Sequence, residues 1–178
     1  MTPGITEETV DGWSGEKGAK MLAAIRDERW PWPPVKGVFL DKPTGGKRPR
    51  GLPVWSEKVV QDIIRAILEA SYDPQCSTDS HGCRPQRGCH PALNEVVETW
   101  MGSQWLIAGD IKGCLDHSDH ALLMHILREN IHEHRFLRVS AGARKAGDCE
   151  AWPCHPALRG SPQGGRVSPI LSNLSMHR

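Results

Sequence analysis

One acidic side chain stands directly after a short apolar run. Residues 105–108 are continuously apolar and are followed by Gly109 and Asp110. A run this short predicts a strand covered on both faces rather than a helix. A carboxylate at a strand end could bind a metal or a substrate, as side chains at such ends do in α/β proteins. An aspartate that only caps a turn is the plainer alternative, and the run alone does not decide between the two.

Two basic clusters could bind phosphates. The first is a predicted β-hairpin, with extended segments at 35–40 and 47–53 around a turn at 43–46, and its only acid is Asp41. Its bases are Lys36, Lys42, Lys47, Arg48 and Arg50. The second cluster is Arg84 and Arg87, in a loop over residues 73–88. Such clusters suit phosphate contacts, although a solvated loop kept soluble by its charges has the same composition.

A glycine-rich turn at residues 160–165 precedes a predicted helix. It offers backbone N–H groups and the side chain of Gln163 to a polar or anionic ligand. The formal net charge of the chain is only +1, so any polyanion would have to meet a local patch.

The six cysteines raise the question of zinc. Cys76, Cys83 and Cys89 are separated by six and five residues, and Cys149 and Cys154 by four. None of these spacings is the two-residue spacing of the usual structural zinc pair. No secretion signal is visible, so we expect free thiols rather than zinc ligands or disulfides.

Apolar periodicity predicts the helices that would position these groups. One is expected near residues 16–29 with Ser14 as its cap, and a strongly amphipathic one begins with Ser56 as its N-cap. Others are expected near 90–101, from Asp119 onward, near 134–146 and after Val167, with a loop at 147–160 that holds a short extended piece. No segment approaches the ~18–20 apolar residues of a membrane-spanning helix. We therefore expect a cytoplasmic protein of one domain, or one domain and an arm, with no membrane partner.

Four blocks in order resemble the reverse transcriptase domain of group II intron-encoded proteins, the reverse transcriptase/maturases. They are 47–53 (Lys-Arg-Pro-Arg-Gly-Leu-Pro), 80–85 (Ser-His-Gly-Cys-Arg-Pro), 109–114 (Gly-Asp-Ile-Lys-Gly-Cys) and 161–165 (Ser-Pro-Gln-Gly-Gly) with Ser168-Pro169. The resemblance implies an α+β fold, the fingers and incomplete palm of a right-hand polymerase, with helices packed on a small, mainly antiparallel sheet. It divides the chain into an N-terminal helical arm, 1–34, and a partial reverse transcriptase domain, 35–178.

The resemblance also implies a function and its residues. The function is RNA-directed DNA polymerisation, the nucleotidyltransferase activity of a mobile element, which adds dNTPs to a DNA primer on an RNA template (intron RNA). Asp110 would be the catalytic carboxylate and, with the Ile111 carbonyl, a ligand of Mg²⁺ in two-metal phosphoryl transfer. Residues matching nucleotide-binding positions are Lys42, Arg48, Leu115 and Gln163. Residues expected to contact nucleic acid are Lys47, Arg50, Arg84, Arg87 and Gly164.

Departures from the family pattern leave alternatives open. The family's second acidic block, Tyr-Ala-Asp-Asp, is expected about two dozen residues beyond the last helix, and the sequence ends at Arg178. Leu115 replaces an aromatic steric gate, Cys83 a Phe, Ser118 and Ser140 apolar residues, and Arg166 a small apolar one. We therefore expect a truncated copy with little activity alone. The alternatives are a non-catalytic, maturase-like RNA-binding remnant, one half of a split enzyme completed by a separate palm and thumb fragment, and an unrelated α/β domain. The sequence leaves the oligomeric state open.

Overall fold

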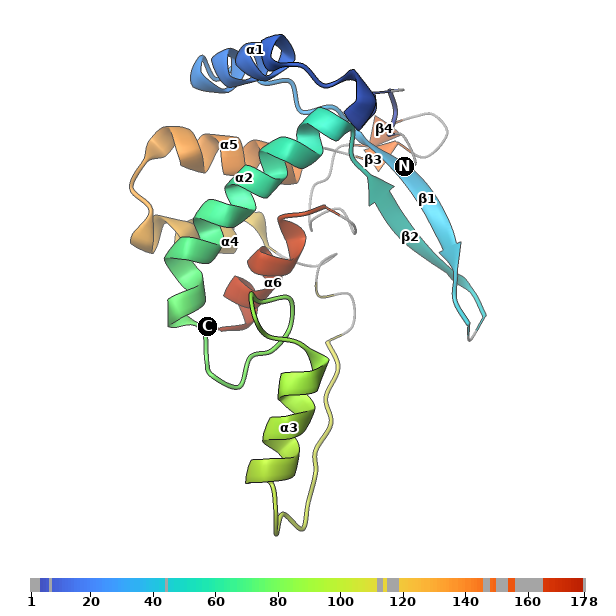
Figure 1. Cartoon of the computed structure of the whole chain (residues 1–178), viewed down its shortest axis with the longest axis vertical. Coiled ribbons are helices and arrows are strands. Elements are labelled where there is room, and N and C mark those ends of the chain that lie inside the picture. The colour runs from blue at the N-terminus through green and yellow to red at the C-terminus, as the bar shows by residue number, and fades with distance from the viewer. Residues whose placement is uncertain are drawn as a thin grey trace.

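The computed structural model describes residues 4–6, 8–43, 45–111, 114, 119–145, 148–149, 154–155 and 165–177. Its elements are shown in Figure 1. The helices are α1 (Gly15–Arg26), α2 (Trp55–Tyr72), α3 (Cys89–Thr99), α4 (His120–Asn130), α5 (His134–Lys145) and α6 (Ser168–Met176), with short 3₁₀ turns η1 (Val10–Gly12) and η2 (Asp73–Gln75). The strands are β1 (Val35–Asp41), β2 (Lys47–Leu52), β3 (Asp148–Cys149) and β4 (Cys154–His155).

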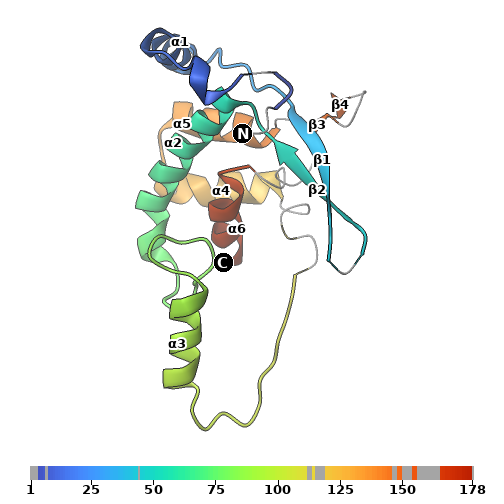
Figure 2. The same cartoon turned by 45° about the vertical axis from the view of Figure 1, so that its right-hand side comes forward.

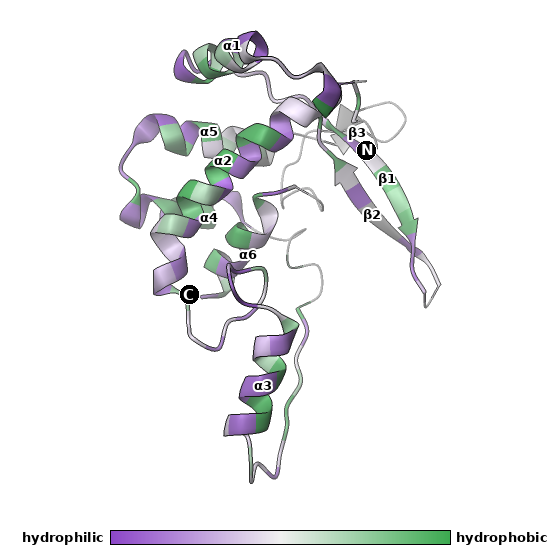
Figure 3. Cartoon of the chain, in the orientation of Figure 1, coloured by the Kyte–Doolittle hydropathy of each residue, from purple (hydrophilic) through white to green (hydrophobic). Residues whose placement is uncertain are grey.

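Helix α2 lies at the centre of the main buried cluster. Its residues Val60, Ile64, Leu68 and Tyr72 recur every four positions and are all buried, as an apolar stripe on a helix requires. They pack with residues of four other helices: Met21 of α1, Leu123 and Leu127 of α4, Leu137 and Ala143 of α5, and Ile170, Leu171 and Leu174 of α6. Figure 3 shows the resulting apolar faces of these helices. The predicted stripe is thus partly confirmed, since Ile63 and Ile67 remain exposed.

The start of α2 differs from the prediction. The helix begins at Trp55 with Val54 as its N-cap residue, so Ser56 is not the cap. The Ser56 hydroxyl instead donates to Glu8 Oε2 at 2.8 Å, and this bond ties the N-terminal segment to α2. The Ser56 side chain therefore bonds to Glu8, which is distant in sequence, instead of capping the helix locally.

Helix α1 contacts the core through its own Met21, and the segment that follows the helix adds a second contact. Its N-cap is Ser14, as predicted, and the Ser14 hydroxyl accepts from the Lys17 N–H at 3.3 Å. The helix ends at Arg26, three residues before the predicted end, because Glu28 adopts a φ of 58°, which no right-handed helix allows. Beyond it, Trp32 packs so closely on α5 that a Cβ at Gly142 would lie 2.0 Å from Trp32 Nε1.

The predicted hairpin is confirmed. Strands β1 and β2 are antiparallel, with Lys36 opposite Leu52 and Asp41 opposite Lys47. The sheet order is β2-β1-β3-β4, with β1 and β3 parallel. Figures 1 and 2 show this sheet beside the helices, and the main buried cluster contains no strand residue among those described. The α+β composition is as expected, whereas the helices pack on one another rather than across the sheet.

The predicted strand at 105–108 is wrong. Residues 103–111 form no helix or strand, and the side chains of Trp105, Leu106 and Ile107 are 89%, 75% and 95% exposed. A strand needs a neighbour to pair its N–H and C=O groups, and none of the described strands lies beside this segment. Figure 2 shows it instead as an extended connection running back from the far end of α3. Within the described part of the chain, no helix combines the length and apolar character needed to cross a membrane.

Candidate nucleic-acid and nucleotide site

The β1–β2 hairpin presents an exposed set of cations. The side chains of Lys36, Lys42, Lys47 and Arg50 are all exposed. None of the four forms an ion pair with any residue that the structure describes. Lys36 and Arg50 occupy register positions of one face, and Lys47 lies on the other, opposite Asp41. The face of Lys36 and Arg50 therefore carries excess positive charge for an approaching anion, whereas Asp41 offsets Lys47 on the other face.

The hairpin turn holds Lys42 at its tip. The Lys42 N–H donates to the Gly46 carbonyl at 2.9 Å, and the Lys42 carbonyl accepts from the Gly45 N–H at 3.0 Å. Gly45 and Gly46 have φ values of 84° and 88°, which only glycine adopts without strain. Arg48 is paired with Leu40 in the ladder, so its backbone is in the same rigid hairpin.

Asp110 lies at the exposed end of the segment 103–111 and is itself exposed. Figures 1 and 2 place the end of this segment and the hairpin on the same side of the helices. Among described residues, no three His, Cys, Asp or Glu side chains come together as a metal-binding group. Around Asp110, the described residues therefore gather fewer than three side chains of these types. Two Mg²⁺ ions need several carboxylate oxygens, so Asp110 and the Ile111 carbonyl do not fit a complete two-metal site.

Arg84 fastens its own loop and is almost fully buried. Its guanidinium donates to Asp73 Oδ1 at 2.7 Å and to the carbonyls of Ser77, Ser80 and Asp73 at 2.6, 2.9 and 2.9 Å. The hydrogen bond to Asp73 raises the pKa of Arg84. Arg87 is more exposed and makes one bond, to the Thr78 carbonyl at 2.6 Å. The structure therefore leaves Arg87, and not Arg84, open to a phosphate.

The residues after the glycine-rich turn are anchored by buried polar groups on α2. The Arg166 N–H donates to Gln61 Oε1 at 2.7 Å, and Gln61 Nε2 donates to Glu57 Oε1 at 2.9 Å. Burial raises the pKa of Glu57 to about 7, against smaller opposing effects of the Gln61 hydrogen bond and Lys58. The Arg166 guanidinium adds an ion pair to Asp62 Oδ2 at 3.0 Å. The sequence interpretation missed Glu57 and Gln61, although two polar residues four apart in line with an apolar stripe were a signal for them.

Three predicted site residues, Leu115, Gln163 and Gly164, lie outside the described residues. Of the positions where the sequence departs from the family pattern, Ser140 is buried, and its hydroxyl has no hydrogen-bond partner among the residues that the structure describes. Cys83 is exposed and adopts a φ of 53°, so its small side chain leaves no hole in a core.

Comparison with known proteins identifies the family. The reverse transcriptase (RNA-dependent DNA polymerase) family matches residues 40–178 of the chain. The chain therefore belongs to the reverse transcriptase family. Several of its relatives are named as intron proteins. One of them, the group II intron-encoded protein LtrA of Lactococcus lactis subsp. cremoris, is 38% identical over 177 residues, which are 99% of this chain and 30% of that protein.

Two eukaryotic relatives agree with this. A 91 kDa protein in the cob intron of Schizosaccharomyces pombe is 38% identical over 178 residues, 100% of this chain and 22% of that protein. The mitochondrial nuclear intron maturase 1 of Arabidopsis thaliana is 28% identical over 96 residues, 54% of this chain and 14% of that protein. The chain spans less than a third of the length of these relatives.

Proposed function

We propose that the chain forms the fingers and the first part of the palm of a group II intron-type reverse transcriptase. In this role it contacts an RNA template, a DNA primer and the incoming dNTP. Lys42 and Arg48 would face the triphosphate, Leu115 and Gln163 would face the sugar and base, and Lys47, Arg50, Arg87 and Gly164 would contact the nucleic-acid strands. The family match and the order of the four sequence blocks support this assignment.

The observation that carries the proposal is the hairpin. Four exposed cations stand on an antiparallel pair and form no ion pair with the described residues, and the single acid of the hairpin, Asp41, lies opposite Lys47. An unneutralised basic surface of this kind binds polyanions through release of counterions, and its affinity falls steeply with salt. The hairpin also exposes Phe39 and Leu40, which offer apolar contact to bases or sugars beside the charges.

Chemistry at Asp110 needs more ligands than the described residues provide. A complete set of carboxylates would hold Mg²⁺, which would supply activation of the primer hydroxyl and stabilisation of the pyrophosphate leaving group. Asp110 would supply one carboxylate to that arrangement, and the 178 residues contain no Tyr-Ala-Asp-Asp sequence. We therefore expect this chain to bind nucleic acid by itself. Primer extension would need further carboxylates, from another segment or from a complementary fragment.

The test combines two readouts on one primed RNA. Fluorescence anisotropy of the 178-residue chain should show binding that weakens steeply between low and moderate salt. The variant Lys42→Gln/Lys47→Gln should bind about tenfold more weakly, while the matched variant Lys20→Gln/Arg26→Gln, on exposed positions of α1, should bind like the wild type.

The second readout is primer extension with dNTPs and Mg²⁺ in the same reaction. We expect no primer extension from the 178-residue chain. The Asp110→Ala variant should therefore give the same result as the wild type. Binding with no salt dependence would remove the proposed role of the hairpin. Robust extension that disappears in Asp110→Ala would show that the chain assembles a complete catalytic site.

A further inference from the structure

A second basic site lies between helices α4 and α5, away from the hairpin. The cavity there has a volume of about 460 Å³, which is within the range of small-ligand pockets. Four of its eight lining residues are basic and none is acidic. The lining residues are His120, Ala121, Met124, Arg128, His134, Leu137, Arg138 and Ala141.

The cations differ in how much of their charge is already neutralised. Arg138 donates to Glu28, which also lies 3.7 Å from Arg135. Arg128, in contrast, forms no ion pair or hydrogen bond with any residue in the described ranges, and it is exposed. Glu129 beside it pairs with His125. Arg128 and His134 are therefore the groups most able to take up an anion without breaking an existing contact.

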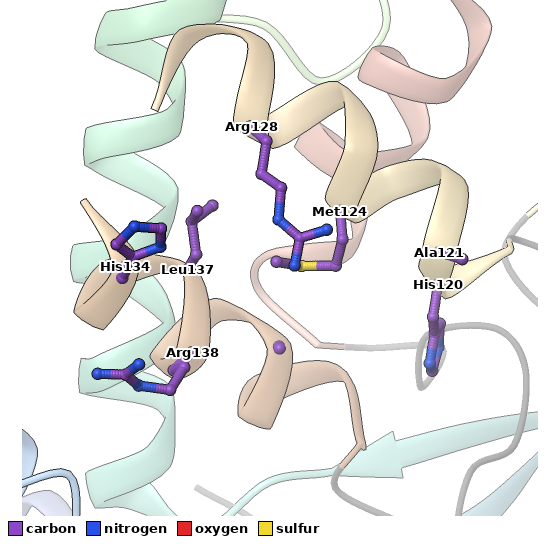
Figure 4. Close-up of a pocket in the computed structure, with 8 residues that line it drawn as sticks. His120, Ala121, Met124, Arg128, His134, Leu137 and Arg138 are labelled. Atoms are coloured by element: carbon purple, nitrogen blue, oxygen red, sulfur yellow. The ribbon is translucent and has the colours of Figure 1, made fainter. Parts of the chain in front are cut away.

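The cavity between α4 and α5 has both basic and apolar residues in its lining. Figure 4 shows the Arg128 guanidinium extending along Met124 into the space between α4 and α5, with His134 and Leu137 across from it on α5. Ala121, Met124, Leu137 and Ala141 supply apolar lining between the basic groups. A guanidinium binds two phosphate oxygens with its fork of N–H donors, and the apolar lining suits a sugar or base attached to that phosphate.

We propose that this cavity, the α4–α5 pocket, binds one nucleotide unit of an RNA strand. Its phosphate contacts Arg128 and His134, and its sugar and base lie against Met124 and Leu137. The choice of RNA as the source of the phosphate rests on the proposed function. The evidence for the pocket is its volume and its basic lining residues, which are not residues of the hairpin.

The first test is binding of a fluorescein-labelled single-stranded RNA, measured by anisotropy at several salt concentrations. Arg128→Gln/His134→Gln should weaken binding about tenfold and lower the salt slope by about 1. Lys20→Gln/Arg26→Gln, which removes at least as much positive charge elsewhere on the chain, is the control, and thermal melts confirm that each variant is folded. A pocket variant that binds like the wild type while the hairpin variant Lys42→Gln/Lys47→Gln weakens overturns the pocket and leaves the proposed function standing.

The second test does not depend on RNA binding. Adenosine monophosphate should raise the melting temperature of the wild-type chain more than inorganic phosphate does, because only the nucleotide reaches the apolar lining. Arg128→Gln/His134→Gln should lose this stabilisation, and the hairpin variant should keep it. Equal stabilisation by both anions would reduce the site to a bare phosphate site and refute the nucleotide assignment. Stabilisation that persists in the pocket variant, or is absent from the wild type, overturns the pocket altogether.

Discussion

Glu57 combines complete burial with a titratable carboxyl. Burial raises its pKa to about 7, so the folded chain holds this proton over a range in which the unfolded chain, with a pKa near 4.5, has released it. Stability must therefore fall as the pH rises from about 4.5 to about 7, and the cost at higher pH is about 3 kcal/mol. The same carboxyl is bonded to Gln61, which anchors Arg166.

Glu57→Gln should remove this pH dependence. We expect the variant to match the wild type in urea denaturation at about pH 5 and to exceed it by about 2–3 kcal/mol at about pH 8. The amide keeps a hydrogen bond to Gln61 and carries no charge to desolvate. The difference between variant and wild type at the two pH values is the measurement, because other titrating groups cancel in it. A constant difference would mean that Glu57 is charged throughout.

Single residues also show where sequence reasoning stops. Asp119 was predicted to begin a helix, and its carboxylate accepts from the N–H groups of Ala121 and Leu122 at 2.7 and 3.3 Å. Arg84 and Arg87 could not be told apart in the sequence. The fold of the loop turns three carbonyls and the Asp73 carboxylate toward Arg84, whereas Arg87 binds one carbonyl, that of Thr78. Capping is local and can be predicted, whereas burial of one arginine among backbone groups is not.

At the scale of elements, the contact between Trp32 and α5 depends on a glycine. Gly142→Ala should destabilise the chain by about 1–3 kcal/mol, because the new methyl group overlaps the indole of Trp32. This loss should appear although alanine favours helix formation over glycine.

Gly18→Ala in α1 is the matched control. Its Cβ would lie 3.6 Å from Trp13 Cζ2, an ordinary contact, so the helix preference of alanine should raise stability by up to about 1 kcal/mol. Thermal or urea denaturation of both variants makes the comparison. A stabilising Gly142→Ala would show that Trp32 does not pack there in solution.

The elements that were predicted correctly are those whose pattern is local. Amphipathic periodicity predicted all six helices, α1 to α6, and the turn at 43–46 predicted the hairpin. The segment at 105–108 has an equally plain apolar pattern, yet pairing needs a strand from elsewhere in the chain. The apolar pattern therefore indicated that the segment favours a strand, but it could not show whether a neighbouring strand would pair with it.

For the whole molecule, the dominant feature is an uncovered apolar surface on α3 and the segment after it. Its exposed residues are Leu93, Val96, Val97, Trp100, Met101, Trp105, Leu106 and Ile107. Figure 3 shows α3 and this segment extending away from the other helices. Exposed apolar area of this extent promotes association between chains.

Trp105→Ser/Ile107→Thr should therefore reduce association without lowering stability. Size-exclusion chromatography with light scattering, over a range of chain concentrations, should show less oligomer for this variant than for the wild type. Phe39→Ser/Leu40→Thr, on the exposed hairpin, is the control and should leave association unchanged. If the two variants behave alike, this surface has no special role in self-association.

Tyr72 joins two points of the chain that are far apart in sequence. Its hydroxyl donates to the carbonyls of Ile126 and Leu127 at 3.2 and 3.0 Å, and Asn130 Nδ2 donates to Gln75 Oε1 at 3.2 Å. The chain thus leaves the core at Gln75 and returns at α4, so α3 lies on a closed loop whose two ends are held together. Loop-closure entropy grows only with the logarithm of length, and doubling such a loop costs about 0.6 kcal/mol. The main buried cluster includes no described residue of this loop, whereas α6 contacts it at two points: Asn173 donates to the Gly82 carbonyl at 2.8 Å, and Ser172 Oγ lies 3.4 Å from Cys114 Sγ. The helical core can therefore accept large changes in the length of the loop between Gly82 and Cys114.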